Sequence, residues 1–258
     1  MFSATPGDLP EAGATEIAGI DLPRGRTVAG SGGDGRAVAW ISEDVLTADE
    51  LGDLVRRLAG VFDRTGLWPV QVPKQYMGSD PDVPWREGRP EPPVTEIPDP
   101  LDVVLRYAAE DAAAIDDDDD DPTSPPPVTG LAPVQRGPDP QAGELDAPED
   151  GALLLVPVAR PADVPAALGW DGAVNADLDA GDVTAVVRSW EDRFGAVLLS
   201  LGLDTMSLQV TRRPETRAQL DALAYEHYAF CSDNYSHDVF SSCRTGLSEW
   251  RRWDFWWD

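Results

Sequence analysis

A chain of 258 residues, 42% of them hydrophobic, is long enough to bury a core in one large or two small domains. It contains no run of about 18 apolar residues, so no membrane-spanning helix is expected. The formal net charge of −27 disfavours direct nucleic-acid binding, because such binding needs a basic stripe that displaces counterions from the phosphates.

Further composition features point to a cytoplasmic protein. The first residues, Met1 to Asp8, lack the basic start and the apolar core of a signal peptide. Two cysteines in a chain of this length do not make a disulfide framework, so a reducing compartment is expected. More than half of the acidic excess lies in residues 90–151, which hold 17 acids and 2 bases. This uneven distribution differs from a salt adaptation, which makes every folded surface acidic.

Residues 1–89 predict a small α/β region. Short strands are expected over 16–22, 26–29 and Ala37–Ile41. Between the last two, Gly30–Gly35 fits the G-x-G-x-x-G pattern of dinucleotide-binding loops, but such a loop must open a helix and a strand follows here. The sequence therefore predicts a flexible hairpin loop and no cofactor.

A helix and a further strand follow in this region. Thr47 to Glu50 form a capping box, which predicts a helix that runs to about Phe62 with apolar residues at helical spacing. Leu67–Val72 predicts the next strand. Pro69 within it indicates a sheet edge or a bulge, because proline donates no ladder hydrogen bond.

Residues 90–151 predict an acidic, proline-rich linker with one short helix. Asp99 and Pro100 supply the N-cap and the first turn of that helix. The aspartates Asp116–Asp121 end it, and such a run is typical of a solvated linker rather than of a calcium site or a nucleic-acid mimic. We expect residues 112–150 to be poorly ordered and open to proteases, because they bury too little apolar surface.

Residues 152–258 predict an α+β domain with a mixed or antiparallel sheet and two or three packed helices. The expected elements are a buried strand over 152–158, a short helix over 161–168, a helix over 182–194 capped by Asp179 or Asp182, a hairpin over 196–201 and 206–211, and a last long helix over 214–230. A region of about 100 residues is an ordinary size for one domain, so we expect it to fold alone.

The chain ends on the aromatic segment Trp253–Asp258. Strand alternation places Trp253, Phe255 and Trp257 on one face and Asp254, Trp256 and Asp258 on the other. An exposed terminus this aromatic would present a large apolar surface, so a buried strand is the better interpretation. We expect it to pair with the strands of the preceding hairpin.

Four short sequence pieces occur in a fixed order in this C-terminal region: Arg188–Gly195, Gly202–Thr205, Tyr228–Asn234 and Phe255–Asp258. Together they resemble the bacterial domain-of-unknown-function family 4253 over about residues 152–258. The segment Arg64–Pro69 is also similar to the N-terminal part of longer members. No established reaction goes with this family, so the resemblance implies a domain boundary and no catalytic residue.

The residues His227, Cys231, His237 and Cys243 are the candidate metal ligands, because zinc takes four nitrogen or sulfur ligands. The paired Cys-x₂₋₄-Cys or His-x₃₋₅-His units that make such sites specific are missing. His227 also shares a helical face with leucines, which is typical of a hydrogen-bonded core histidine. We therefore expect no bound metal.

A nucleophilic pair is another interpretation of the same helix. His227 lies one turn from Cys231 and could act as its base, oriented by Glu226 or Asp233. Burial would raise the pKa of the cysteine and silence it. Glu226, Asp233 and Asp238 could also serve as an acid–base or metal-binding set, although surface or capping roles are more usual.

Two function classes remain. We favour a non-catalytic binding protein that neutralises a basic protein partner, with acidity steering the encounter. The alternative is a small hydrolase-like or metal-dependent enzyme that uses Glu226, His227, Cys231 and Asp233. An open cleft that gathers the side chains of His227, Cys231, Asp233 and His237 would favour the enzyme, whereas their dispersal or burial in the core would favour binding.

Overall fold

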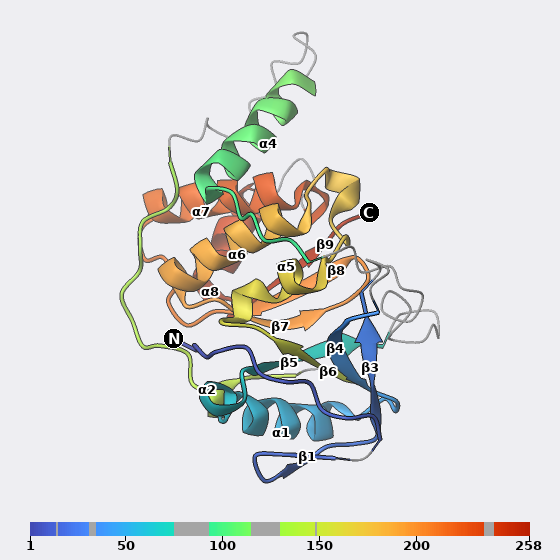
Figure 1. Cartoon of the computed structure of the whole chain (residues 1–258). Coiled ribbons are helices and arrows are strands. Elements are labelled where there is room, and N and C mark those ends of the chain that lie inside the picture. Colours follow the sequence, from blue (N-terminus) through green and yellow to red (C-terminus); the bar gives the residue numbers. More distant parts are fainter. Residues whose placement is uncertain (14, 31–34, 75–92, 115–129, 148, 235–239) are drawn as a thin grey trace.

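A computed structural model describes residues 1–13, 15–30, 35–74, 93–114, 130–147, 149–234 and 240–258. Helices lie on both sides of a central mixed sheet (Figure 1). The α+β class expected from the sequence is therefore confirmed. No helix in the described ranges combines the length and the apolar composition that a bilayer crossing requires.

Within the described residues the main sheet has seven strands in the order β3-β4-β6-β5-β7-β8-β9. All neighbours are antiparallel except β5 and β7. The strands are β3 Gly25–Ala29, β4 Ala37–Ser42, β5 Leu67–Pro73, β6 Gly151–Pro157, β7 Val197–Leu201, β8 Thr205–Gln209 and β9 Arg252–Trp256. A separate small hairpin pairs β1 (Glu16–Ile17) with β2 (Ile20–Asp21).

The helices divide between the two faces of this sheet. One side carries α1 and α2, and the other side carries α5, α6, α7 and α8 with α4 beyond them (Figure 1). Their bounds are α1 Ala48–Ala59, α2 Phe62–Thr65, α4 Pro100–Ala114, α5 Val164–Leu168, α6 Ala180–Phe194, α7 Arg217–Phe230 and α8 Phe240–Glu249. Short 3₁₀ turns are η1 Ala142–Glu144, η2 Pro161–Asp163, η3 Val174–Ala176 and η4 Ser232–Asn234.

Capping residues in the sequence begin the longer helices. Thr47 and Glu50 form the expected capping box at α1. Asp179 caps α6, and Asp182 completes a capping box with it, so both candidates named from the sequence take part. Helix α7 is capped by Thr216 and begins after it, which is later than the proline at 214 predicted.

Strand β5 lies inside the sheet, so the prediction of an edge or a bulge at Pro69 was wrong. Pro69 is in register with Leu155 of β6, and on its other side β5 pairs with β7 at Gln71 and Ser200. The indole N–H of Trp68 donates to the carbonyl oxygen of Leu198 on β7 at 2.9 Å. A side chain next to the proline thus supplies a contact that a backbone N–H would normally make.

Strands from both sides of residue 151 share the main sheet. Strand β6 lies between β4 and β5, both of which precede residue 74 in the chain. Residues 1–89 therefore supply β3, β4 and β5 to the same sheet as the C-terminal strands. The structure does not test the expectation that residues 152–258 fold alone, but this sharing of strands argues against it.

The middle of the chain contributes to the core. Leu101 N donates to Asp99 Oδ1 at 2.8 Å, which confirms the expected cap of α4. Residues 130–147 pack against the body of the protein, with Ala132 and Leu145 buried. Poor order over 112–150 was therefore a wrong prediction for this part, while the aspartate run 116–121 lies outside the described residues.

The aromatic C-terminal strand is buried as predicted. Trp253, Phe255 and Trp257 all face the core, where Trp190 of α6 lies 5.4 Å from Phe255 between ring centres. Strand β9 pairs with β8, and not also with β7 as we expected. Helix α8 was missed from the sequence, because its residues are mostly small and polar and carry little helical periodicity.

Candidate functional site

Three of the four predicted catalytic residues are sealed in the core. Glu226 and Cys231 have no exposed surface and His227 is 2% exposed, whereas Asp233 is exposed. Burial of this kind excludes substrate from Glu226 and Cys231, and leaves only a small part of His227 exposed, at a hollow described below.

The buried carboxylate of Glu226 has a structural role. It accepts hydrogen bonds from Arg193 Nη1 at 2.9 Å and Nη2 at 2.5 Å, and from Trp190 Nε1 at 2.8 Å. The backbone N–H of Ala132 donates to it at 2.6 Å. Glu226 thus joins α7 to α6 and to the 130–147 segment, and its charge is paired as a buried carboxylate requires.

His227 is enclosed by aromatic rings. Its ring centre lies 4.7 Å from that of Trp190 and 4.5 Å from that of Trp253. Burial, helped by the positive charge of Arg193, lowers the pKa of His227 to about 3. The imidazole is therefore neutral near pH 7 and is a weak base.

Cys231 is a protonated thiol that contacts the end of the chain. Its Sγ donates to the carbonyl oxygen of Trp256 at 3.0 Å. Burial raises the pKa of Cys231 to about 12, so the thiolate that a nucleophile or a metal ligand requires is scarce at neutral pH. Asp233 accepts a hydrogen bond from the backbone N–H of Asp258 at 3.0 Å, a contact that connects η4 to the residues after β9.

The metal candidates give no assembled site in the described part of the chain. Cys231 and Cys243 are buried, and neither is in a disulfide. His237 and Asp238 lie outside the described residues. Among those described, no group of three or more His, Cys, Asp or Glu side chains is arranged to hold a metal ion.

The sequence pieces Tyr228–Asn234 and Phe255–Asp258 contact each other along the outer edge of β9. The amide of Asn234 donates through Nδ2 to the carbonyl oxygen of Asp254 at 2.7 Å and accepts through Oδ1 from the N–H of Trp256 at 3.2 Å. One side chain thereby makes the hydrogen bonds that a neighbouring strand would make. It covers an edge that is otherwise prone to pair with other chains.

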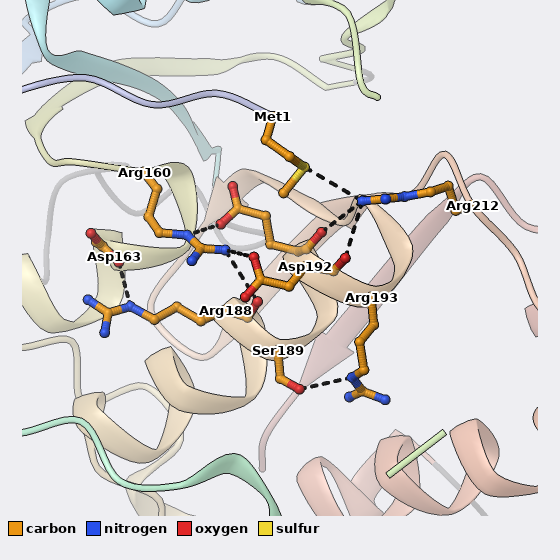
Figure 2. A network of polar contacts seen from close by, with 9 residues as sticks. Met1, Arg160, Asp163, Arg188, Ser189, Asp192, Arg193 and Arg212 are labelled. Atoms are coloured by element: carbon orange, nitrogen blue, oxygen red, sulfur yellow. Dashed lines mark hydrogen bonds and ion pairs between the residues drawn. The ribbon is translucent and has the colours of Figure 1, made fainter. Parts of the chain in front are cut away.

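Ion pairs made by the Arg188–Gly195 piece connect α6 to the segment before α5 (Figure 2). Arg160 Nε lies 2.5 Å from Glu191, and Arg160 Nη2 lies 2.5 Å from Asp192. One turn earlier, Arg188 pairs with Asp163 at 2.7 Å. The charged residues of this piece thus position α6 and line none of the hollows described below.

Glu191 has the most perturbed carboxyl group of this network. Burial raises its pKa to about 7, and the charge of Arg160 opposes that rise. Its Oε1 is buried and has no hydrogen-bond partner. A carboxyl group with this pKa can serve as an acid or a base, but Glu191 is only 1% exposed and lines none of the hollows described below.

With these pieces placed in the structure, comparison with known families is informative. A family model described as Domain of unknown function (DUF4253) matches residues 152–258. Residues 152–258 are a DUF4253 domain. The resemblance of the C-terminal region is confirmed, while Arg64–Pro69 lies outside the matched range. No curated protein and no solved structure matches the chain.

Within the described part of the chain, one face of the sheet of the DUF4253 domain is only partly covered. Helix α1 covers β5 and β6 on this face, and the backbone of residues 144–146 covers Gln209 at the end of β8. Beyond them lies a hollow of about 660 Å³, which we call the Trp256 hollow. Its lining residues are Pro73, Lys74, Glu149, Ser200, Gly202, Leu203, Asp204, Thr205, Ser207, Asn234, Arg252, Asp254, Phe255 and Trp256.

An exposed indole and paired charges mark the Trp256 hollow. Trp256 is 45% exposed, although it stands between two buried aromatic residues. Arg252 Nε pairs with Asp254 at 2.8 Å, so these charges largely compensate each other. Of the remaining charged groups, Glu149 and Asp204 outnumber Lys74, which leaves a small acidic excess.

Sequence reasoning recognised only part of this surface. Alternation along β9 had placed Trp256 on the face opposite the core, and that signal was sufficient to find it. Asn234 and Arg252 were not identified as site residues. Their positions depend on how η4 and β9 come together, and no local sequence pattern records that contact.

Proposed function

We propose that this protein is a non-catalytic binding module that holds a basic protein partner on the open face of β7, β8 and β9. The observation that carries this proposal is the exposure of Trp256 beside a hollow of about 660 Å³. Tryptophan is enriched among the residues that dominate binding energy at protein interfaces. Small hydroxyl side chains at Ser200, Thr205 and Ser207 surround it and leave room for a partner.

The charge of the chain supports a basic partner. The net charge of −27 attracts a cationic protein over long range and raises the association rate at low salt. At close range Glu149 and Asp204 can pair with Lys or Arg side chains, and an indole face attracts the same cations. The proposal therefore requires that association slows as salt is added.

The burial of the candidate catalytic residues supports binding over catalysis. The carboxylate of Glu226 is already hydrogen-bonded to Arg193 and Trp190. The pKa values of His227 and Cys231 lie outside the range that a catalytic base and its nucleophile need near pH 7. The enzyme alternative would require Glu226, His227 and Cys231 to become accessible by a rearrangement of the core.

A capture experiment with one altered side chain tests the proposal. The full chain is immobilised and exposed to an extract of its source organism, and each retained protein is purified and its affinity measured. We expect the partner to be basic. Trp256→Ala should lower its affinity by about tenfold or more, as for a residue at the centre of an interface. Trp250→Ala is the matched control, because Trp250 is 52% exposed and does not line the Trp256 hollow.

Two results would contradict the proposal. One is a partner without excess positive charge. The other is an affinity that Trp256→Ala leaves unchanged.

A further inference from the structure

A second hollow lies at the outer edge of β9, and the proposed function does not use it. Its volume is about 510 Å³, within the range of about 300–1,000 Å³ that is usual for small-molecule sites. We call it the Trp250 hollow. Its lining residues are His227, Asn234, Trp250, Arg251, Arg252, Trp253 and Asp254.

The indole of Trp250 is held in place on one side by α8. A Cβ atom added to Gly246 would lie 2.3 Å from the Trp250 ring, so the ring rests against the glycine backbone. The backbone N–H of Trp250 donates to the carbonyl oxygen of Gly246 at 2.6 Å. Because the side chain is still 52% exposed, it offers a supported aromatic surface beside the hollow.

The same hollow carries an available cation. Arg251 is exposed and makes no ion pair within the described part of the chain. Its neighbour Arg252 forms an ion pair with Asp254. Both arginines also line an adjoining hollow of about 370 Å³, whose other charged residues are Arg56, Glu144 and Asp146.

This local arrangement differs from the rest of the molecule. The charged groups of the Trp250 hollow are Arg251, Arg252 and Asp254, which give a positive excess in a protein with a net charge of −27. Most of the acidic surface repels anions. A guanidinium group that no carboxylate neutralises, beside a fixed indole, is suited to a ligand that is both planar and negatively charged.

We infer that the Trp250 hollow binds an aromatic anion, whose planar ring stacks on Trp250 and whose phosphate or carboxylate group pairs with Arg251. Stacking of a ring on an aromatic side chain and a charge-assisted hydrogen bond to guanidinium act together, so each half of the ligand alone should bind more weakly than the whole. This inference does not rest on the proposed function, because Trp250 and Arg251 do not line the Trp256 hollow. The two hollows share Asn234, Arg252 and Asp254.

Titration calorimetry on the full chain at low salt tests the inference with defined probes. Adenosine 5′-monophosphate supplies a ring with a phosphate, and indole-3-acetate supplies a ring with a carboxylate. We expect at least one of them to bind, and to bind about tenfold or more tightly than both its separate halves, which are adenosine and inorganic phosphate, or indole and acetate. Failure of both aromatic anions to bind at millimolar concentration would overturn the inference.

Three substitutions locate the site. Arg251→Ala should lower the affinity for the anionic probe about tenfold and leave the affinity for its uncharged half unchanged. Trp250→Ala should lower both affinities. Gly246→Ala should act like Trp250→Ala by displacing the indole. Arg217→Ala is the matched control, because Arg217 is an exposed arginine on α7 away from this hollow. Equal loss in Arg217→Ala and Arg251→Ala would show nonspecific attraction and would overturn the assignment.

Discussion

Glu191 and Glu226 show two outcomes for a buried carboxylate. Glu226 accepts hydrogen bonds from Arg193, Trp190 and Ala132, so its oxygens are all engaged. Glu191 pairs with Arg160 through one oxygen and leaves the other without a partner. Desolvation therefore dominates at Glu191 and raises its pKa to about 7.

Glu191 should make the stability of the protein depend on pH. Its folded pKa of about 7 is higher than the ordinary value of 4.5, so between these values the folded state binds more protons than the unfolded state. The contribution of Glu191 to the free energy of unfolding should therefore fall as the pH rises from about 4.5 to about 7, by at most about 1.4 kcal/mol per pH unit. The contribution of His227 has the opposite sign, because its folded pKa of about 3 is lower than the ordinary value of 6.5. Urea unfolding at several pH values measures the sum of these contributions.

Glu191→Gln isolates the contribution of this one group. Glutamine does not titrate, so the difference in unfolding free energy between the native chain and Glu191→Gln should shift in favour of the variant as the pH rises through that window. Contributions of other titrating groups, such as His227, largely cancel in the difference. A difference that stays constant across the window would show that Glu191 is ionised throughout.

At the scale of elements, the strand edge at β9 is protected by a side chain. Asn234 in η4 bonds to Asp254 and Trp256, where a further strand would otherwise dock. The sequence pieces Tyr228–Asn234 and Phe255–Asp258 meet at this contact. A buried aromatic strand at the sheet edge needs a cover, and the amide of Asn234 provides one.

Asn234→Ala should weaken this edge. Loss of two hydrogen bonds, each with a net contribution of about 0.5–1.5 kcal/mol, should lower the free energy of unfolding by about 1–3 kcal/mol and increase association between chains. Chemical unfolding and light scattering measure the two effects. Asn175→Ala is the control, because Asn175 is an exposed residue of η3. Equal behaviour of the two variants would mean that the amide of Asn234 does not protect β9.

At the scale of the whole molecule, the sheet unites the two ends of the chain. Strand β6 begins the DUF4253 domain, and its neighbours β4 and β5 both come from the N-terminal region. The 130–147 segment adds a second connection through the bond from Ala132 to Glu226. Residues outside the matched range therefore complete the core around the domain.

The fragment 152–258 should consequently fold poorly by itself. It would expose both edges of β6, including Leu154 and Leu155, which are fully buried in the complete chain. We expect a broad, weakly cooperative thermal transition, and its recovery when residues 1–151 are supplied as a second fragment. Calorimetry of the two pieces, separately and mixed, checks this. A sharp transition of residues 152–258 alone would instead support the domain boundary expected from the sequence.

Local sequence patterns determined most of the elements and the burial of the C-terminus. The capping residues at Thr47 and Asp179 and the alternation along Trp253–Asp258 depend on neighbours within a few positions, so the sequence alone is sufficient to find them. The interior position of β5 could not be found in this way. It depends on the indole of Trp68 reaching Leu198, which is 130 residues away in the chain.

The same distinction applies to the candidate sites. The sequence placed Glu226 and His227 correctly on one helix, whereas Cys231 is the residue that ends it. It could not show that Arg193 and Ala132 would enclose Glu226 or that aromatic rings would surround His227. It placed Trp256 opposite the core, while its position beside a hollow required β7, β8 and β9 to stand side by side. Spacing along the chain sets which way a side chain points, and only long-range packing sets whether it meets core, solvent or a ligand.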